Sequence, residues 1–288
     1  MKKGLVMEGG AMRGLFTAGI LDVLMEEGIT TDGAIGVSAG AAFGCNFKSG
    51  QIGRALRYNK EYCRDKRYCS FHSLITTGDL YGAEFCYKTL PEELDLFDNE
   101  AYESNPMEFY VVCTDVVTGQ PVYKKCDSFR GNNLEWIRAS ASLPLVSRVV
   151  EIEGYKLLDG GISDAIPLKH FESLGYEKNL VILTQPEGYV KKKNSINGVF
   201  KVVLKNYPKL QLAMERRHIM YNEELSYVDE REEKGAALVL RPKEALPVKR
   251  TSKNPELLQK TYDLGRELAK EKLSEIKAFL CNKKNECR

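Results

Sequence analysis

Long hydrophobic runs are missing from this chain of 288 residues. The first apolar run, GLVM before Glu8, is too short for the core of a signal peptide. No later run approaches the ~20 apolar residues of a membrane-spanning helix, so we expect a cytoplasmic protein. Nothing in the sequence reads as a long linker, and residues 1–288 are therefore predicted to form a single domain.

A strong excess of charge of one sign is also lacking. Lys and Arg nearly balance Asp and Glu, which leaves a formal net charge of +2 at pH 7. The two signs are interspersed along the chain, so no electrostatic attraction to nucleic acid is expected. The class of partner must therefore come from motifs and not from composition.

Metal-binding spacings are absent as well. Cys63 and Cys69, like Cys281 and Cys287, are separated by five residues, whereas zinc sites space paired ligands by about two to four. No histidine lies close to either pair, so we predict no metal site and no other cofactor. The eight cysteines are expected to remain thiols, because a cytoplasmic chain of this length needs no disulfides.

The chain alternates apolar runs of strand length with helical patterns. This order favours an α/β fold in which helices cover both faces of a largely parallel sheet. Between residues 49 and 105 the pattern loosens into short helical pieces, which predicts a helical cap insertion. A basic helical pattern at 196–224 and an amphipathic helix at 255–280 follow, the latter within a helical extension over 250–288.

The stretch AIGVSAG, residues 34–40, places Ser38 between Gly36 and Gly40 where a strand ends and a small-residue helix begins. A G-x-S-x-G match alone is a weak signal, but a strand before it and a helix after it are the context of a nucleophile elbow. The free N–H groups at the start of that helix would favour developing negative charge. Ser38 is thus a candidate nucleophile, and the alternative is a small residue packed in a tight turn.

Histidines that could activate a serine are few. The chain has three, namely His72, His170 and His218, and none of them directly follows a predicted strand. A serine hydroxyl is a poor nucleophile until a base accepts its proton. Each histidine is expected to be a surface or partly packed residue. The order Ser, Asp, His along the chain would nevertheless permit His170 or His218 to act as the base.

Asp159 is better placed to act as the base. It ends a predicted strand, and Gly160 and Gly161 give the backbone freedom to turn the carboxylate into a crevice at the sheet edge. Burial would raise the pKa of this carboxylate and favour proton transfer from a serine. The alternative is a turn residue bonded to its own backbone, with Asp164 and Asp115 as substitutes.

A third glycine-rich turn, EGGAMRG at residues 8–14, opens the first predicted helix. Backbone N–H groups in such a turn suit the oxyanion of an acyl-transfer intermediate, and they suit a phosphate equally well. The pattern G-x-A-x-x-G is close to a dinucleotide fingerprint. A dinucleotide site needs an acidic residue after the second strand, however, and this chain has Val37 and Ser38 there.

Taken in this order, EGGAMRG, GVSAG and LLDGG resemble the motifs of the patatin-like phospholipases, from about Lys3 to Leu168. The resemblance implies a three-layer α/β/α patatin-like fold. It further implies that Ser38 and Asp159 form a Ser–Asp dyad without histidine. By the same likeness the segment SASLP, residues 140–144, lines the site.

The resemblance also assigns the oxyanion hole to the backbone of Gly9, Gly10 and Ala11. The family usually has a third glycine where this chain has Ala11, and a methyl group is acceptable there only at negative φ. The N–H of Ala11 remains available at either sign of φ, so activity is expected. Arg13 follows the family pattern and is a candidate contact for a lipid phosphate, with a helix-surface arginine as the alternative.

The implied activity is hydrolysis of fatty-acyl esters in phospholipids or lysophospholipids through an acyl-enzyme. Two alternatives stay open: a transacylase, in which an alcohol replaces water, and a regulatory protein that binds a nucleotide or phosphate at EGGAMRG. The basic stretch from Tyr189 to Tyr221 would allow peripheral contact with anionic lipid, and the alternative is a solvated helix packed by its apolar side. The sequence does not predict an oligomeric state.

Overall fold

The computed structural model describes residues 1–193 and 203–281. In these ranges eight strands form one sheet in the order β5–β6–β3–β2–β1–β7–β8, with β4 paired to β3 off this path. The strands are β1 (Lys2–Met7), β2 (Gly33–Val37), β3 (Glu108–Asp115), β4 (Pro121–Lys125), β5 (Val150–Ile152), β6 (Tyr155–Asp159), β7 (Tyr176–Ile182) and β8 (Ala237–Leu240). Strands β3, β2, β1, β7 and β8 are parallel to their neighbours in this order. Strands β4 and β6 pair antiparallel with β3, and β5 pairs antiparallel with β6. The predicted largely parallel sheet is therefore confirmed.

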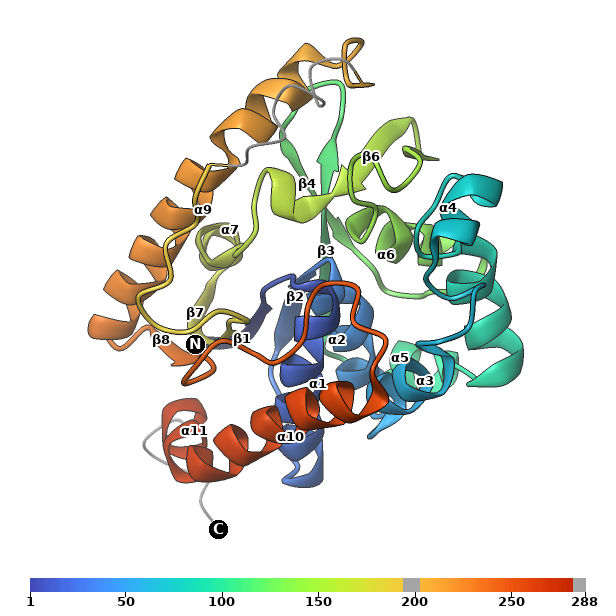
Figure 1. The fold of residues 1–288 in the computed structure, drawn as a ribbon. Helices are drawn as coiled ribbons and strands as arrows, with labels where there is room; N and C mark the ends of the chain where they lie inside the picture. The colour runs from blue at the N-terminus through green and yellow to red at the C-terminus, as the bar shows by residue number, and fades with distance from the viewer. Residues whose placement is uncertain (194–202, 282–288) are drawn as a thin grey trace.

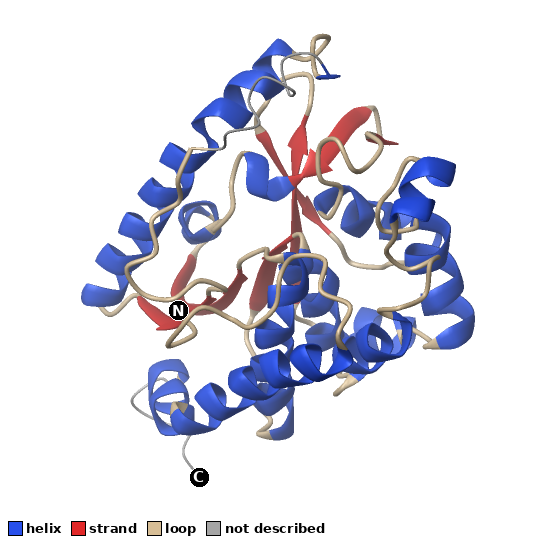
Figure 2. Cartoon of the chain, in the orientation of Figure 1, coloured by secondary structure: helices blue, strands red, loops and turns tan. Residues whose placement is uncertain are grey.

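Helices cover both faces of this sheet (Figures 1 and 2). Leu5 and Met7 of β1 pack on one face, and Val6 between them packs on the other, because side chains alternate along a strand. The first face is covered by α1 (Gly14–Glu26), α2 (Ala39–Ser49), α6 (Leu134–Ser140), α10 (Pro255–Glu271) and α11 (Leu273–Leu280). The second is covered by α7 (Leu168–Ser173) and α9 (Pro208–Glu233), which confirms the three-layer α/β/α arrangement.

The segment between α2 and β3, predicted as a cap, consists of short helices. They are α3 (Arg54–Tyr62), α4 (Phe71–Thr77), η2 (Phe85–Leu94) and α5 (Asn99–Ser104). Aromatic and aliphatic side chains of the segment, including Tyr58, Phe85 and Leu90, share an apolar cluster with Met12 and Phe43. The segment thus packs over the parts of the chain that flank the first two glycine-rich turns.

The predictions for the last third of the chain need two corrections. The amphipathic pattern 255–280 was expected to be one helix, but it is broken at Lys272 into α10 and α11. The basic pattern 196–224 was expected to be helical throughout, yet α9 begins only at Pro208 and continues to Glu233. Residues 194–202 of that pattern lie outside the described residues.

Helix α9 lies along the sheet with its apolar side chains buried. Its buried residues are Leu210, Met214, Tyr221 and Val228. The helix therefore fits the second interpretation of the basic stretch, a helix packed by its apolar side. Within the two described ranges, no helix is long and apolar enough to cross a membrane.

Candidate active site

Ser38 lies in a strained turn between β2 and α2. Its backbone angles are φ 55° and ψ −120°, which a residue other than glycine adopts at a cost of about 1–3 kcal/mol. A Cβ at Gly36 would lie 2.6 Å from the backbone nitrogen of Ala41, and one at Gly40 would lie 2.4 Å from the carbonyl oxygen of Met7. Both positions therefore require glycine, and together they give the tight strand-to-helix geometry of a nucleophile elbow.

Ser140 supports this turn from α6. Its hydroxyl accepts a hydrogen bond of 2.8 Å from the N–H of Ser38 and donates one of 2.6 Å to the carbonyl of Val112. Ser140 is completely buried, so neither contact is shared with solvent. The SASLP segment was predicted to line the site, and its Ala141 and Leu143 do line a cavity beside Ser38. Sequence reasoning did not anticipate that Ser140 would hold the elbow itself.

Two strands bring Ser38 and Asp159 together. Strand β2 pairs with β3, and its last residue, Val37, lies opposite Val112. Strand β6 also pairs with β3, and its last residue, Asp159, lies opposite Cys113. Strand β4 pairs with β3 over both stretches, so β2 and β6 must share the other edge of β3. Because β2 is parallel and β6 antiparallel to β3, their carboxyl ends meet between Val112 and Cys113.

The side chain of Asp159 lies beside that of Ser38, and both residues line one small pocket. The Oδ1 of Asp159 accepts the N–H of Gly161 at 2.8 Å, and only 2% of the residue is exposed. Burial raises the pKa of Asp159 above its ordinary value, while the charge of Arg217, the Ser38 hydroxyl and the Gly161 N–H act in the opposite direction. The site therefore places a desolvated carboxylate next to the hydroxyl of Ser38.

The alternative bases lie elsewhere. Asp164 accepts a 2.6 Å hydrogen bond from Tyr123, and Asp115 accepts the hydroxyl of Thr118 and the N–H of Val117 in a turn. His170 stacks on Tyr123, with ring centroids 3.4 Å apart, and burial lowers its pKa. Neither His170 nor the other two histidines, His72 and His218, lines the pockets beside Ser38.

The turn from Glu8 to Arg13 faces the elbow. A Cβ at Gly9 would lie 2.9 Å from the Cβ of Ser38, so the two turns are in direct contact. In the described part of the chain, the N–H groups of Gly9, Gly10 and Ala11 donate to no protein acceptor. They are therefore available to an oxygen atom bound at Ser38.

The condition for a methyl group at position 11, a negative φ, is not met in the structure. The φ of Ala11 is 49°, in the left-handed region where a Cβ is disfavoured by roughly 1–2 kcal/mol. Ala11 begins the single 3-10 turn η1 (Ala11–Arg13) that joins β1 to α1. The chain must reverse sharply there, and the turn imposes the conformation that glycine would adopt more easily.

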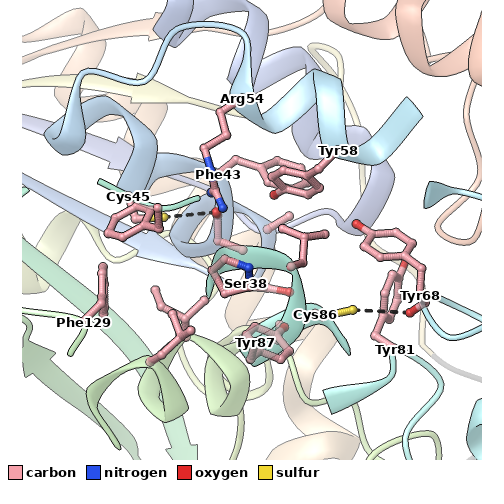
Figure 3. A pocket seen from close by; sticks show the side chains of 18 of the residues that line it. Ser38, Phe43, Cys45, Arg54, Tyr58, Tyr68, Tyr81, Cys86, Tyr87 and Phe129 are labelled. Atoms are coloured by element: carbon pink, nitrogen blue, oxygen red, sulfur yellow. Dashed lines mark hydrogen bonds between the residues drawn. The ribbon is translucent and has the colours of Figure 1, made fainter. Parts of the chain in front are cut away.

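A cavity of about 370 Å³ opens beside Ser38. Figure 3 shows Ser38 among aromatic side chains from both the core and the segment 49–105. The walls of this cavity are mainly apolar and include Phe43, Tyr58, Tyr68, Tyr87, Leu90, Phe97, Phe129, Leu134 and Ile137. The size lies at the lower end of the ~300–1,000 Å³ usual for small-molecule sites, and the lining suits a hydrocarbon chain.

A second, smaller pocket of about 40 Å³ lies on the other side of Ser38. Ser38, Ala11 and Leu143 line both spaces, whereas Asp159 lines only the smaller one. Arg13, predicted as a phosphate contact, lines it together with Lys191, Arg217 and Arg250. Sequence reasoning did not predict these last three as site residues; Lys191 and Arg217 belong to the basic stretch for which peripheral lipid contact and a solvated helix are the two interpretations.

The described ranges contain no group of three His, Cys, Asp or Glu side chains that could hold a metal ion. The free thiols include those of Cys45, Cys63, Cys69, Cys86, Cys113 and Cys126. Burial raises the pKa of Cys45, which lines the apolar cavity, to about 12, so it stays neutral.

Comparison with known families agrees with this arrangement. A profile described as patatin-like phospholipase matches residues 5–171, which is more than half of the chain. The chain therefore belongs to the patatin-like phospholipase family, a class of lipid acyl hydrolases. A second profile, a domain of unknown function named DUF6363, matches residues 207–281.

Individual relatives share parts of the chain. It is 33% identical to the uncharacterized protein YjjU of Escherichia coli K12, over 63% of this chain and 52% of that protein. It is 27% identical to lysophospholipase nte1 of Aspergillus oryzae, over 69% of this chain and 13% of that protein. The chain thus spans about half of the first relative and a small part of the second.

Proposed function

We propose that this chain is a serine acyl hydrolase that cleaves fatty-acyl esters of phospholipids or lysophospholipids through a Ser38–Asp159 dyad. The observation that carries the proposal is that the strained Ser38 lies directly beside the buried carboxylate of Asp159. The apolar cavity that begins at the same serine supports an acyl chain as the group transferred. Family membership and the relative named lysophospholipase support the same class of substrate.

In the proposed acylation step, the Oγ of Ser38 attacks the ester carbonyl carbon while its proton passes to Asp159. The carbonyl oxygen becomes an oxyanion, which accepts hydrogen bonds from the free N–H groups of Gly9, Gly10 and Ala11. Collapse of this intermediate breaks the bond to the leaving alcohol, and Asp159 returns the proton to that alcohol's oxygen. The acyl group remains as an ester of Ser38.

Deacylation repeats these steps with water. Asp159 accepts a proton from the attacking water, the same N–H groups stabilise the second oxyanion, and the proton returns to Ser38 Oγ as the fatty acid leaves. The raised pKa of Asp159 makes its carboxylate a stronger proton acceptor than an exposed one. A histidine is not needed in this scheme, in keeping with the finding that none of the three lines either pocket beside Ser38.

We also propose that the segment 49–105 acts as a cap that contacts the lipid surface through α4. Phe71 is 78% exposed and Ile75 is 83% exposed, and residues four apart lie on one side of a helix. Arg64 and Lys66, just before this helix, are exposed cations that would favour anionic lipid. Replacing both apolar residues with serine should weaken sedimentation with anionic vesicles, whereas the pair Leu174→Ser and Tyr155→Ser should not.

The experiment that tests the proposed reaction is turnover of a lysophospholipid by the native chain, Ser38→Ala and Asp159→Asn. Both variants should lose at least about 10³-fold in kcat while keeping the native circular dichroism spectrum. Substantial hydrolysis by Ser38→Ala would refute the proposal.

A further inference from the structure

Four cationic side chains surround the smaller pocket beside the dyad, and we refer to them as the basic cluster. They are Arg13, Lys191, Arg217 and Arg250. The carboxylates among the pocket's lining residues belong only to Glu8 and Asp159. Within residues 1–193 and 203–281, no member of the cluster forms a salt bridge, so positive charge is in excess here.

Glu8 does not neutralise the cluster by direct contact. Its Oε1 accepts the hydroxyl of Tyr221 at 2.6 Å, and its Oε2 accepts the N–H and the hydroxyl of Thr184 at 2.5 and 3.0 Å. These neutral donors occupy both carboxylate oxygens. Glu8 therefore organises the floor of the pocket and leaves the cations free to meet a ligand.

Lys191 and Arg217 are held in place before any ligand arrives. The backbone N–H and C=O of Lys191 are both bonded to the side chain of Asn222, and its ammonium lies 3.9 Å from the centre of the Tyr221 ring. The Nε of Arg217 donates to the carbonyl of Gly161, which lies two residues after Asp159. This is the only hydrogen bond of the Arg217 side chain in the described structure, so its two terminal nitrogens still have N–H groups to donate.

The members of the cluster repel one another. Burial, together with the charges of Arg217, Arg250 and Arg13, lowers the pKa of Lys191 to about 7, and burial likewise lowers the pKa of Arg217. Lys191 and Arg217 are desolvated, and the two carboxylates of the pocket, Glu8 and Asp159, only partly offset its four cations. Buried charge that is not balanced is costly to maintain in a folded protein. An anion bound among these cations would remove that cost, and phosphate oxygens are well matched to arginine and lysine donors.

The two spaces meet at the nucleophile. Ser38, Ala11 and Leu143 line both the apolar cavity and the basic pocket. An ester carbonyl at Ser38 with its acyl chain in the cavity would direct its alcohol half into the basic pocket. Asp159 also lines the basic pocket, where it could protonate the leaving alcohol. The pocket is small, about 40 Å³, which leaves room for a group of a few heavy atoms.

We propose that the basic cluster binds the phosphoryl group of the substrate's alcohol half, so that the enzyme prefers acyl esters whose head group carries net negative charge. This inference rests on the proposed function, and it names Lys191, Arg217 and Arg250 as specificity-determining residues contributed by the last third of the chain. A head group with its own cation, such as choline, would be disfavoured because that cation would meet the cluster.

The test compares three lipids with the same acyl chain: lysophosphatidic acid, lysophosphatidylcholine and the uncharged monoacylglycerol. Lys191→Gln and Arg250→Gln are measured beside their exposed neighbours Lys192→Gln and Lys249→Gln. The native chain should turn over lysophosphatidic acid with the highest kcat/KM. The ratio of kcat/KM for lysophosphatidic acid to kcat/KM for the monoacylglycerol should fall by about tenfold in each cluster variant, mainly through a higher KM for lysophosphatidic acid. The neighbour variants should keep the native ratio.

Binding to Ser38→Ala protein, measured by calorimetry, separates this inference from the proposed reaction. Lysophosphatidic acid should bind more tightly than the monoacylglycerol, and adding Lys191→Gln should remove the difference. Equal affinities, or an unchanged kcat/KM ratio in both cluster variants, would overturn the head-group assignment even if hydrolysis depends on Ser38. Inorganic phosphate binding as tightly as the lipid would also overturn it, because it would indicate a free-anion site. Selective binding without Ser38-dependent hydrolysis would instead refute the proposed reaction alone.

Discussion

Ser38 and Asp159 lie at the carboxyl ends of two strands that run toward each other along one edge of β3. This meeting of β2 and β6 sets the distance between the two side chains through the sheet itself. Loops are usually more mobile than strands, so two side chains held at strand ends in this way stay fixed relative to each other. Only the proton and the substrate need to move during the proposed reaction.

The charge of Arg217 should set the acid limb of the pH profile. Arg217 lowers the pKa of Asp159, and burial raises it. The base works only when ionised, so activity falls as the pH drops through that pKa. Replacing Arg217 with Gln removes the opposing charge, and the pKa of Asp159 should rise further. The acid limb of kcat/KM for an uncharged ester should therefore move to higher pH.

Arg216→Gln provides the matched control for this shift. Arg216 is the exposed neighbour of Arg217 on α9 and does not line the pocket. Its substitution should leave the acid limb in place. An acid limb that moves equally in both variants, or that moves to lower pH in Arg217→Gln, would contradict the electrostatic account.

Removing the Ser140 hydroxyl should weaken the elbow. Ser140→Ala leaves the N–H of Ser38 and the carbonyl of Val112 buried without their partner. Each unsatisfied group costs about 1–3 kcal/mol, so we expect a fall of roughly 3–10 °C in Tm. The turnover number should fall by about tenfold, because the nucleophile loses its backbone support.

Ser142→Ala is the control for Ser140→Ala. The Ser142 hydroxyl is also buried, but it donates only to the carbonyl of Arg138 in its own helical turn. Its loss should cost less stability and leave turnover close to native. If thermal melts and kinetics of the two variants coincide, Ser140 has no special role at the elbow.

The sequence was sufficient to predict the sheet and the proximity of Ser38 and Asp159, because the signals for both are local. Each motif follows an apolar strand directly, and the turn glycines at 36 and 40 are required by contacts with adjacent backbone. The basic cluster could not be anticipated in this way. Arg217 reaches Gly161 only because α9 packs across the second face of the sheet, and no short pattern encodes that placement.

Two other differences have similar causes. The helical periodicity from 255 to 280 is continuous, yet α11 turns away at Lys272, and Lys178 of β7 donates to the carbonyl of Phe279. The positive φ of Ala11 comes from the reversal between β1 and α1 and is independent of the preference of alanine itself. Tertiary packing outweighs local propensity in both cases.

Glycine at position 11 should relieve strain. The left-handed conformation of Ala11 costs about 1–2 kcal/mol, and the added freedom of glycine in the unfolded chain costs about 0.4–1 kcal/mol. Ala11→Gly should therefore keep or slightly raise the free energy of unfolding, and its N–H should continue to serve the oxyanion. Chemical denaturation and ester hydrolysis measure both effects.

The comparison variant is Ala278→Gly, at an exposed position within α11. Glycine in an ordinary helical conformation costs about 1 kcal/mol, so this variant should be destabilised. A loss of the same size in Ala11→Gly would argue against strain at position 11.

Filling the apolar cavity should change chain-length preference. Ala42 lines the cavity one turn into α2 from Ser38, and Ala42→Leu adds three carbon atoms to that wall. The ratio of kcat/KM for a palmitoyl ester to that for a butyryl ester should fall by about tenfold. Ala245→Leu, at an exposed position away from this cavity, should leave the ratio unchanged. An unchanged ratio in Ala42→Leu would place the acyl chain elsewhere.

Labelling with a fluorophosphonate tests the central claim most directly, because the reagent reports an activated serine without requiring a known substrate. The account predicts modification of the native chain at Ser38, no labelling of Ser38→Ala, and strongly slowed labelling of folded Asp159→Asn. Peptide mapping of the adduct by mass spectrometry identifies the modified residue. Labelling at another serine, or labelling of Asp159→Asn at the native rate, would contradict the Ser38–Asp159 dyad.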